Sequence, residues 1–329
     1  MPKNHKNLSL LVHPITPTLD NLSMNNAISV LKSAKNSLVG LSPLDGVTDE
    51  PFRLVQCQIA KPDLIYTEFV SAEGIAHGAK KLYNTLKYSE IERPIIAQLF
   101  GKEPSSFFIA AQKIIELGFD GIDINMGCPA KTVTQHGSGA ALIEKPELAK
   151  KIIKEVQKAV KNKITVSVKT RLGGEKWFPF LLDQGLDFLT IHGRTLKQGY
   201  SGTADWKQIA KVAEISKIPI IGNGDIQNRK MGEEYCRQYG VWGVLIGRAA
   251  MGNPWVFNNH IPTPKERFET AALHAQIFCD IFPERRFDSM RKHFLLYASG
   301  LPNAKKLRSK IVVCNSVSDF LALEQDFLG

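Results

Sequence analysis

The sequence predicts a parallel α/β barrel followed by a small helical domain. Eight short apolar segments, rich in β-branched residues, recur between residues 37 and 246. Amphipathic helical patterns separate these segments. Strands that are apolar on both faces are typical of a parallel sheet covered by helices, and eight such units close into a (β/α)8 TIM barrel.

The expected strands are segments 37–42, 63–67, 94–99, 121–125, 164–170, 187–192, 218–222 and 241–246. Segment 146–161 is typical of the helices between them, because Pro146 suits a first turn and apolar residues then recur every four positions. The crossover between residues 174 and 187 is short and contains Pro179. We therefore expect an abbreviated helix there.

Three regions follow from these patterns. Residues 1–36 are expected to form an N-terminal extension, residues 37–258 the barrel, and residues 264–329 a helical domain after an Asn- and Pro-containing linker. Helical patterns in the last region cover 266–282, 285–299, 303–312 and 316–327.

The net charge favours a polyanionic partner. The chain carries 42 basic and 32 acidic residues, a formal charge of +10. Residues 285–310 hold eight Lys or Arg against a single acid, Asp288. A solvated helix face is the alternative, but so large an imbalance favours a surface that faces phosphates.

Cysteine spacing and hydropathy indicate the cellular compartment in which the protein works. The five cysteines form no C-x-x-C pair and no short metal-binding spacing, so no metal and a reducing cytoplasm are expected. The apolar piece at residues 8–12 is too short for a signal sequence. No apolar run approaches the roughly 18 residues of a membrane span, so no membrane association is expected.

Polar residues lie at the end of most predicted strands. The carboxyl ends of barrel strands share one face, where active sites are built, so these residues together predict a ligand site. They are Gln98, Asn125, Lys169, Arg171, His192, Asn223, Gly224, Asp225, Gly247 and Arg248. Cys128 follows strand 121–125, and its thiol is either catalytic or a small buried apolar group.

The last two strand ends indicate a phosphorylated cofactor. Gly222, Gly224 and Gly247 let backbone N–H groups approach an anion, and Arg248 adds charge. Lys169 is suited to balance negative charge on a reduced flavin, while Gln98 and Asn125 can hydrogen-bond its ring edges. Gly137-Ser138-Gly139 lacks the third glycine of a dinucleotide fingerprint, so NADPH is expected to reach the flavin transiently from the open face.

Nine motifs appear in order between residues 38 and 320. Those of the barrel are Ser-Pro-Leu-Asp-Gly-Val-Thr-Asp at 42–49, Thr-Glu-Phe at 67–69, Gln-Leu-Phe-Gly at 98–101, Asp-Ile-Asn-Met-Gly-Cys-Pro-Ala-Lys at 123–131, Gly-Ser-Gly-Ala-Ala-Leu at 137–142, Val-Lys-Thr-Arg-Leu-Gly at 168–173, His-Gly-Arg-Thr at 192–195, Asn-Gly-Asp-Ile at 223–226 and Ile-Gly-Arg-Ala-Ala at 246–250. Met-Arg-Lys-His at 290–293 fits as well. The sequence thus resembles the bacterial tRNA-dihydrouridine synthases, leaning to the B-type subgroup.

This resemblance implies an FMN enzyme that reduces specific uridines of tRNA to 5,6-dihydrouridine with NADPH. It implies Cys128 as the proton donor to uracil C5. The implied FMN contacts are Pro43, Leu44, Asp45, Gln98, Lys169, His192, Asn223, Gly224, Asp225, Gly247 and Arg248. The implied tRNA contacts are Asn125, Arg171, Arg194, Tyr200, Arg291, Lys292, Lys305, Lys306 and Arg308. A cytoplasmic monomer is expected.

The chain departs from the family pattern in its first motif. That motif usually reads Ala-Pro-Met, whereas Ser42, Leu44 and Asp45 stand here. Two other functions are compatible with parts of the sequence: an FMN barrel that reduces a small molecule, as dihydroorotate dehydrogenases do, and a non-catalytic RNA-binding barrel. The basic tail argues against the first, and the Lys169, Cys128 and Gly247-Arg248 set argues against the second.

Overall fold

The computed structural model describes residues 37–301 and 303–328. The predicted N-terminal extension, residues 1–36, lies outside this range. The strands are β1 (Leu38–Leu41), β2 (Ile65–Tyr66), β3 (Val70–Ser71), β4 (Ile95–Phe100), β5 (Gly121–Met126), β6 (Thr165–Leu172), β7 (Phe188–Thr195), β8 (Ile220–Asn223) and β9 (Gly243–Ile246). Each expected strand is present, and the short β3 was not predicted.

The strands form a nearly closed parallel barrel, which confirms the predicted fold class. Their order is β1-β9-β8-β7-β6-β5-β4-β2, with β3 beside β4, and every pair is parallel. Two backbone hydrogen bonds join β1 to the segment before β2: Leu41 N donates to Leu64 O at 2.8 Å and Asp63 N to Val39 O at 3.0 Å. The carboxyl ends of the strands therefore meet at one face.

Side chains fill the barrel in two chemically different layers. An apolar cluster occupies one part of the interior, separate from the larger core between strands and helices; it comprises Leu38, Leu64, Tyr66, Ile96, Phe188, Ile221 and Leu245. Two positions further along the strands, the residues become polar, as Gln98 follows Ile96 and Asn223 follows Ile221. Because alternate strand residues point to the same side, these polar residues continue the inward face toward the carboxyl ends.

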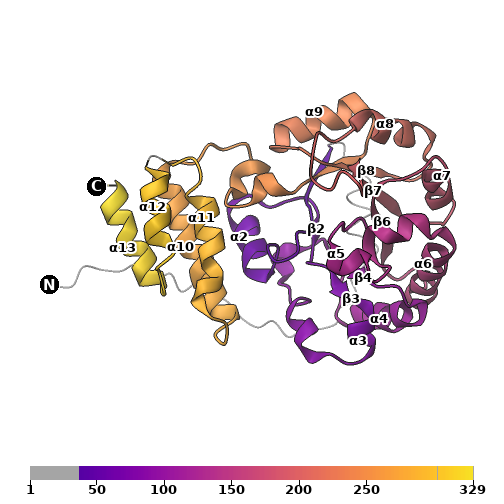
Figure 1. Ribbon diagram of the computed structural model, residues 1–329, viewed down its shortest axis with the longest axis horizontal. Coiled ribbons are helices and arrows are strands. Elements are labelled where there is room, and N and C mark those ends of the chain that lie inside the picture. Colours follow the sequence, from indigo (N-terminus) through magenta and orange to yellow (C-terminus); the bar gives the residue numbers. More distant parts are fainter. Residues whose placement is uncertain (1–36, 302, 329) are drawn as a thin grey trace.

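Helices cover the outside of the barrel (Figure 1). They are α2 (Glu50–Ala60), α3 (Ala72–Ala76), α4 (Pro104–Glu116), α6 (Pro146–Val160), α7 (Trp177–Leu182), α8 (Trp206–Ile215) and α9 (Arg229–Tyr239). The four-residue α5 (Lys131–Thr134) belongs to the loop after β5. Helix α6 begins at the predicted proline and buries Ile152, Ile153 and Val156 against the sheet. Helix α7 has only 6 residues, as the short crossover predicted.

Four helices form the C-terminal region: α10 (Pro264–Ile281), α11 (Arg291–Tyr297), α12 (Ala304–Ile311) and α13 (Val317–Leu328). A capping box fixes the start of α10, because Thr263 accepts from Glu266 N while Glu266 accepts from Thr263 N. These helices enclose their own apolar cluster, which includes Phe268, Phe294 and Phe320.

Helix α2 joins the barrel to the C-terminal helices. It lies between them in Figure 1, and its Leu54 and Val55 pack with Ile277 of α10. Its Phe52 ring lies 5.9 Å from His274 of α10 and 6.0 Å from His293 of α11, measured between centroids. Within the part of the chain that the structure describes, no helix is long and apolar enough to cross a membrane.

Candidate active site

A cavity of about 880 Å³ opens at the carboxyl ends of the strands. This position is where ligand sites of barrel enzymes form, and the volume suits a cofactor-sized molecule. Fifteen of the residues predicted for the site line the cavity: Pro43, Leu44, Asp45, Gln98, Asn125, Cys128, Lys169, Arg171, His192, Tyr200, Asn223, Gly224, Asp225, Gly247 and Arg248. The structure therefore brings together residues that are up to 205 positions apart in the chain, from Pro43 to Arg248 (248 − 43).

The loop that carries Cys128 is held by Asn125. The side-chain Oδ1 of Asn125 accepts hydrogen bonds from Gly127 N at 3.0 Å and from Cys128 N at 2.9 Å. On the other side, Ala140 N donates to Cys128 O at 3.1 Å. The thiol is thus fixed at the rim of the cavity by backbone contacts on two sides.

The Cys128 thiol is held in its protonated form. Burial raises its pKa above the ordinary value, and the Asp45 carboxylate adds to this increase. The hydrogen bond at Ala130 and the cations Arg171 and Lys169 act in the opposite direction but do not reverse it. A protonated thiol facing a cavity can donate a proton and is a poor nucleophile.

A buried relay of side chains orients Asn125. Its Nδ2 donates to Gln98 Oε1 at 3.0 Å, and Gln98 Nε2 donates to Asp123 Oδ2 at 2.7 Å. The other Asp123 oxygen accepts from Ser167 Oγ at 2.6 Å. Burial raises the pKa of Asp123 to about 6. Because an amide nitrogen carries two hydrogens, Asn125 and Gln98 each keep a second donor for a ligand.

Lys169 provides a cation at the centre of the site. Its Nζ donates to Asn223 Oδ1 at 3.0 Å, and Asn223 is oriented by its own bond from Nδ2 to Leu245 O at 2.9 Å. Burial and the nearby Arg171 lower the pKa of Lys169 to about 8. An anionic ligand placed beside this ammonium would raise the pKa of Lys169 and be stabilised by its charge.

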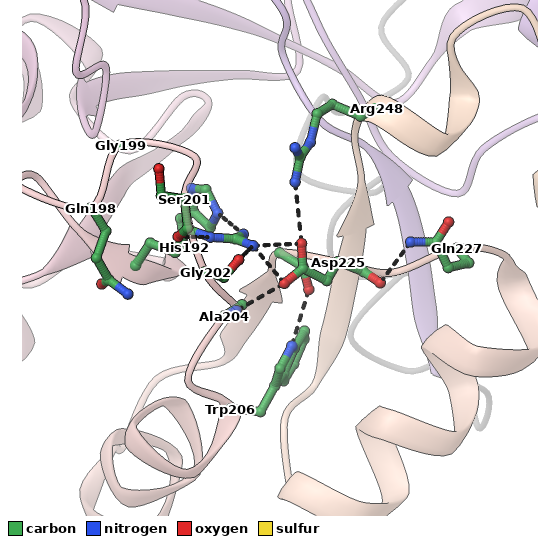
Figure 2. Close-up of polar contacts among 12 residues, drawn as sticks. His192, Gln198, Gly199, Ser201, Gly202, Ala204, Trp206, Asp225, Gln227 and Arg248 are labelled. Carbon is green, nitrogen blue, oxygen red and sulfur yellow. Dashed lines mark hydrogen bonds and ion pairs between the residues drawn. The ribbon is translucent and has the colours of Figure 1, made fainter.

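Asp225, beyond the end of β8, binds the guanidinium groups of Arg194 and Arg248; Figure 2 shows the contact with Arg248. It accepts from Arg194 Nη2 at 2.7 and 2.8 Å, from Arg248 Nη2 at 3.1 Å and from Ala204 N at 2.8 Å. Burial alone would raise the pKa of Asp225, but the hydrogen bonds from Arg194 and Ala204 lower it overall. The carboxylate therefore stays charged and fixes both guanidinium groups.

His192 is neutral and its tautomer is defined. Burial, with the surrounding cations Lys169, Arg171, Arg194 and Arg248, lowers its pKa to about 2. Its Nε2 lies 3.2 Å from Arg194 Nη1. Since a guanidinium can only donate, Nε2 is the acceptor and the ring proton resides on Nδ1.

Tyr200 forms an aromatic surface at the mouth of the cavity. Its side chain is 57% exposed, and the guanidinium carbons of Arg171 and Arg248 lie 5.4 and 5.5 Å from its ring centre. Arg171 is held by donation to Gly127 O and to Gly199 O, both at 2.7 Å. An exposed ring flanked by cations suits an electron-rich planar ligand that carries phosphates.

The sequence of this barrel is similar to that of a known protein family. A family model described as "Dihydrouridine synthase (Dus)" matches residues 40–328. The chain belongs to this family.

Its curated relatives cover almost the whole chain. A "Probable tRNA-dihydrouridine synthase" from Staphylococcus aureus (strain COL) is 34% identical over 304 residues, 87% of this chain and 92% of the relative. A "Probable tRNA-dihydrouridine synthase 1" from Synechocystis sp. is 35% identical over 329 aligned positions, 94% of this chain and 91% of the relative. These relatives confirm the predicted membership in the dihydrouridine synthase family.

A solved structure supports the fold alone. Histamine dehydrogenase from Rhizobium sp. 4-9 has a TM-score of 0.52 at 12% sequence identity, covering 74% of this chain and 49% of that chain. At this identity the likeness concerns the barrel and not the chemistry.

Arg194, predicted as a tRNA contact, does not line the cavity. The residue is 2% exposed, and its guanidinium donates to Ser201 O, Gly202 O and Asp225. In this dihydrouridine synthase Arg194 holds the loop after β7 against Asp225. It acts through the protein and does not face the solvent.

The five basic tail residues predicted to contact tRNA divide into two groups. Lys305, Lys306 and Arg308 lie exposed on α12. Arg291 instead donates to Cys314 O at 3.0 Å and Asn315 Oδ1 at 2.8 Å. Lys292 donates to the backbone oxygen of Gly46 in the barrel. Sequence reasoning also assigned no role to Asp123, although its place on the polar side of strand 121–125 was visible.

Proposed function

We propose that this protein is a flavin-dependent reductase that converts uridines of tRNA to 5,6-dihydrouridine. Membership in the dihydrouridine synthase family, and relatives named as tRNA-dihydrouridine synthases, support the reaction. The observation that carries the catalytic assignment is the Cys128 residue held by Asn125 and Ala140 at the rim of the cavity that Lys169 also lines, with burial raising the pKa of its thiol. Because the proposed substrate is tRNA, we expect the protein to act in the cytoplasm.

FMN is the proposed flavin and NADPH the proposed reductant. Lys169 and Arg248 supply cationic groups suited to an anionic ring edge and a phosphate. Gly247 lines the cavity next to the first motif, because a Cβ placed on it would contact Ser42 Cβ at 3.6 Å and Leu44 Cδ2 at 3.7 Å. The residues proposed to hold FMN are Pro43, Leu44, Asp45, Gln98, Lys169, His192, Asn223, Gly224, Asp225, Gly247 and Arg248. When bound, a flavin supplies hydride transfer.

The residues around the cavity have distinct tasks in this reaction. The enolate character that develops at uracil C5 needs a nearby neutral acid, and the Cys128 thiol provides that proton. Asn125 holds the thiol in place and offers its second amide hydrogen to the base. Tyr200 offers an exposed ring to the extruded uracil. Arg171 lines the cavity beside it with a side chain that is 1% exposed, and we propose that it adds positive charge there.

The exposed basic residues of α12 are the proposed phosphate contacts of the tail. Lys305, Lys306 and Arg308 occupy one short helix and form no salt bridge with the residues that the structure describes. Turning a base out of a folded RNA costs a few kcal/mol, which such contacts can offset.

Cys128→Ala tests the catalytic assignment. The variant should retain its flavin and accept electrons from NADPH, because neither step uses the thiol proton. Its reoxidation by unmodified tRNA should slow by roughly 10²- to 10⁴-fold, as when a general acid is removed. Rapid-mixing absorbance measurements, normalised to bound flavin, give this rate.

Cys279→Ala provides the matched control, because Cys279 is also partly exposed but lies on α10. It should reoxidise at the parent rate. A Cys128→Ala rate within a few-fold of the parent would show that another group donates the proton.

A further inference from the structure

The start of α11 contacts the loop at residues 42–48, which we call the 42–48 loop. Lys292 Nζ donates to the carbonyl oxygen of Gly46. Leu44 and Asp45, immediately before Gly46, line the cavity. A residue of the C-terminal helices therefore reaches a segment proposed to contact the flavin.

Gly46 is held from two sides. Its N–H donates to Glu68 Oε1 at 2.6 Å, while its carbonyl accepts from Lys292. Its φ of +72° places it in the left-handed region, which glycine adopts readily. The barrel thus holds the N–H of Gly46, and the C-terminal helices hold its carbonyl.

The charges around Lys292 are acidic. Burial raises the pKa of Asp45 and of Asp49, and Lys292 counteracts both increases. Burial, with Asp49 and Asp45 nearby, raises the pKa of Glu68 to about 7. Lys292 already donates to Gly46 O and faces these carboxyl groups, so an RNA phosphate at this point would compete with both contacts.

The position of Lys292 is fixed by its neighbour in the sequence. His293 is 2% exposed, its ring centre lies 6.0 Å from that of Phe52 in α2, and it lies 4.6 Å from that of His274. Because α2 begins directly after the 42–48 loop, the same packing sets the distance between Lys292 and Gly46.

We propose that Lys292 is a positioning residue that holds the 42–48 loop in the shape that receives the flavin, and so couples the C-terminal helices to cofactor binding. This inference rests on the proposed function, since it takes the loop to be part of the flavin site. It replaces the predicted contact between Lys292 and tRNA.

The experiment compares Lys292→Met with Lys305→Met, because methionine keeps an unbranched apolar stem and removes the charge. FMN affinity is measured by fluorescence titration of the flavin-free protein, and tRNA affinity is measured at several salt concentrations. Lys292→Met should weaken FMN binding by about three- to thirtyfold, as expected for a lost charge-assisted hydrogen bond at an exposed position, and leave the salt slope of tRNA binding unchanged. Lys305→Met should leave FMN binding unchanged and reduce the salt slope by about one.

A third variant separates positioning from general damage. Lys292→Arg keeps a cationic donor and should restore FMN affinity to within about threefold of the parent, which a merely disturbed fold would not do. Parent-like FMN affinity in Lys292→Met, with or without a smaller salt slope, would overturn the proposal. Failure of the parent protein itself to bind FMN would instead refute the proposed function.

Discussion

Replacing Asn125 by Ala should loosen the loop that carries Cys128. The change removes the acceptor for two backbone N–H groups, those of Gly127 and Cys128, at 3.0 and 2.9 Å. An unsatisfied buried donor costs about 1–3 kcal/mol, and these two are partly buried, so about 2–4 kcal/mol in total is expected. Since about 1.4 kcal/mol is a factor of ten, the open form of the loop should become about 30- to 700-fold more populated.

Amide hydrogen exchange at Gly127 and Cys128, together with the rate of alkylation of the Cys128 thiol, measures this opening without reference to catalysis. Both should accelerate in Asn125→Ala. Asn125→Asp is the control, because one carboxylate oxygen can still accept from both N–H groups. The buried Cys57 serves as an internal reference for global unfolding. Exchange and alkylation of Asn125→Ala within twofold of the parent would refute the argument.

Two further predictions concern packing and pH. Gly224→Ala should destabilise the protein and reduce its flavin content, because the new Cβ would lie 2.6 Å from Ala204 Cβ and the residue has a φ of +124°. Thermal unfolding measures the effect, with Gly174→Ala as the control because the space around Gly174 is open. Equal melting temperatures of the two variants would contradict the prediction. Burial lowers the pKa of His293 to about 3 and that of His274 well below its ordinary value. The two neutral imidazoles therefore contribute their full stability above the unfolded-state pKa of about 6.5. This contribution is lost as the pH falls from about 6.5 through about 3. Denaturant unfolding at pH 7 and pH 5 should show a smaller loss of stability in His293→Gln than in the parent, and an equal loss would mean that the imidazole is charged in the folded state.

Local patterns were sufficient to predict the barrel. Strand and helix periods depend on neighbouring residues, and so segments such as 121–125 and 146–161 were located within about two residues of β5 and α6. The two-residue β3 was missed because it exists through pairing with β4, from Val70 to Leu99, and has no period of its own.

The membership of the site was predictable for a related reason. Residues at the carboxyl ends of parallel barrel strands lie at one face of the barrel, whichever side chains they hydrogen-bond to. Their pairing was not predictable, since it depends on atoms far apart in the chain. Arg194 turned inward to Asp225, and Lys292 reached Gly46, 246 positions away.

Because α10 and α11 pack on α2, the barrel cannot be separated from the C-terminal helices without exposing apolar side chains. A fragment ending at Asn258 would contain every strand, yet it would uncover Leu54 and Val55, which pack against Ile277 in the whole chain. It would also remove the rings of His274 and His293 that cover Phe52. Such a fragment would expose an apolar stripe beside the 42–48 loop and would tend to aggregate. The C-terminal helices thus cover the outward side of α2, and exchanging them between relatives would require exchanging that side of α2 with them.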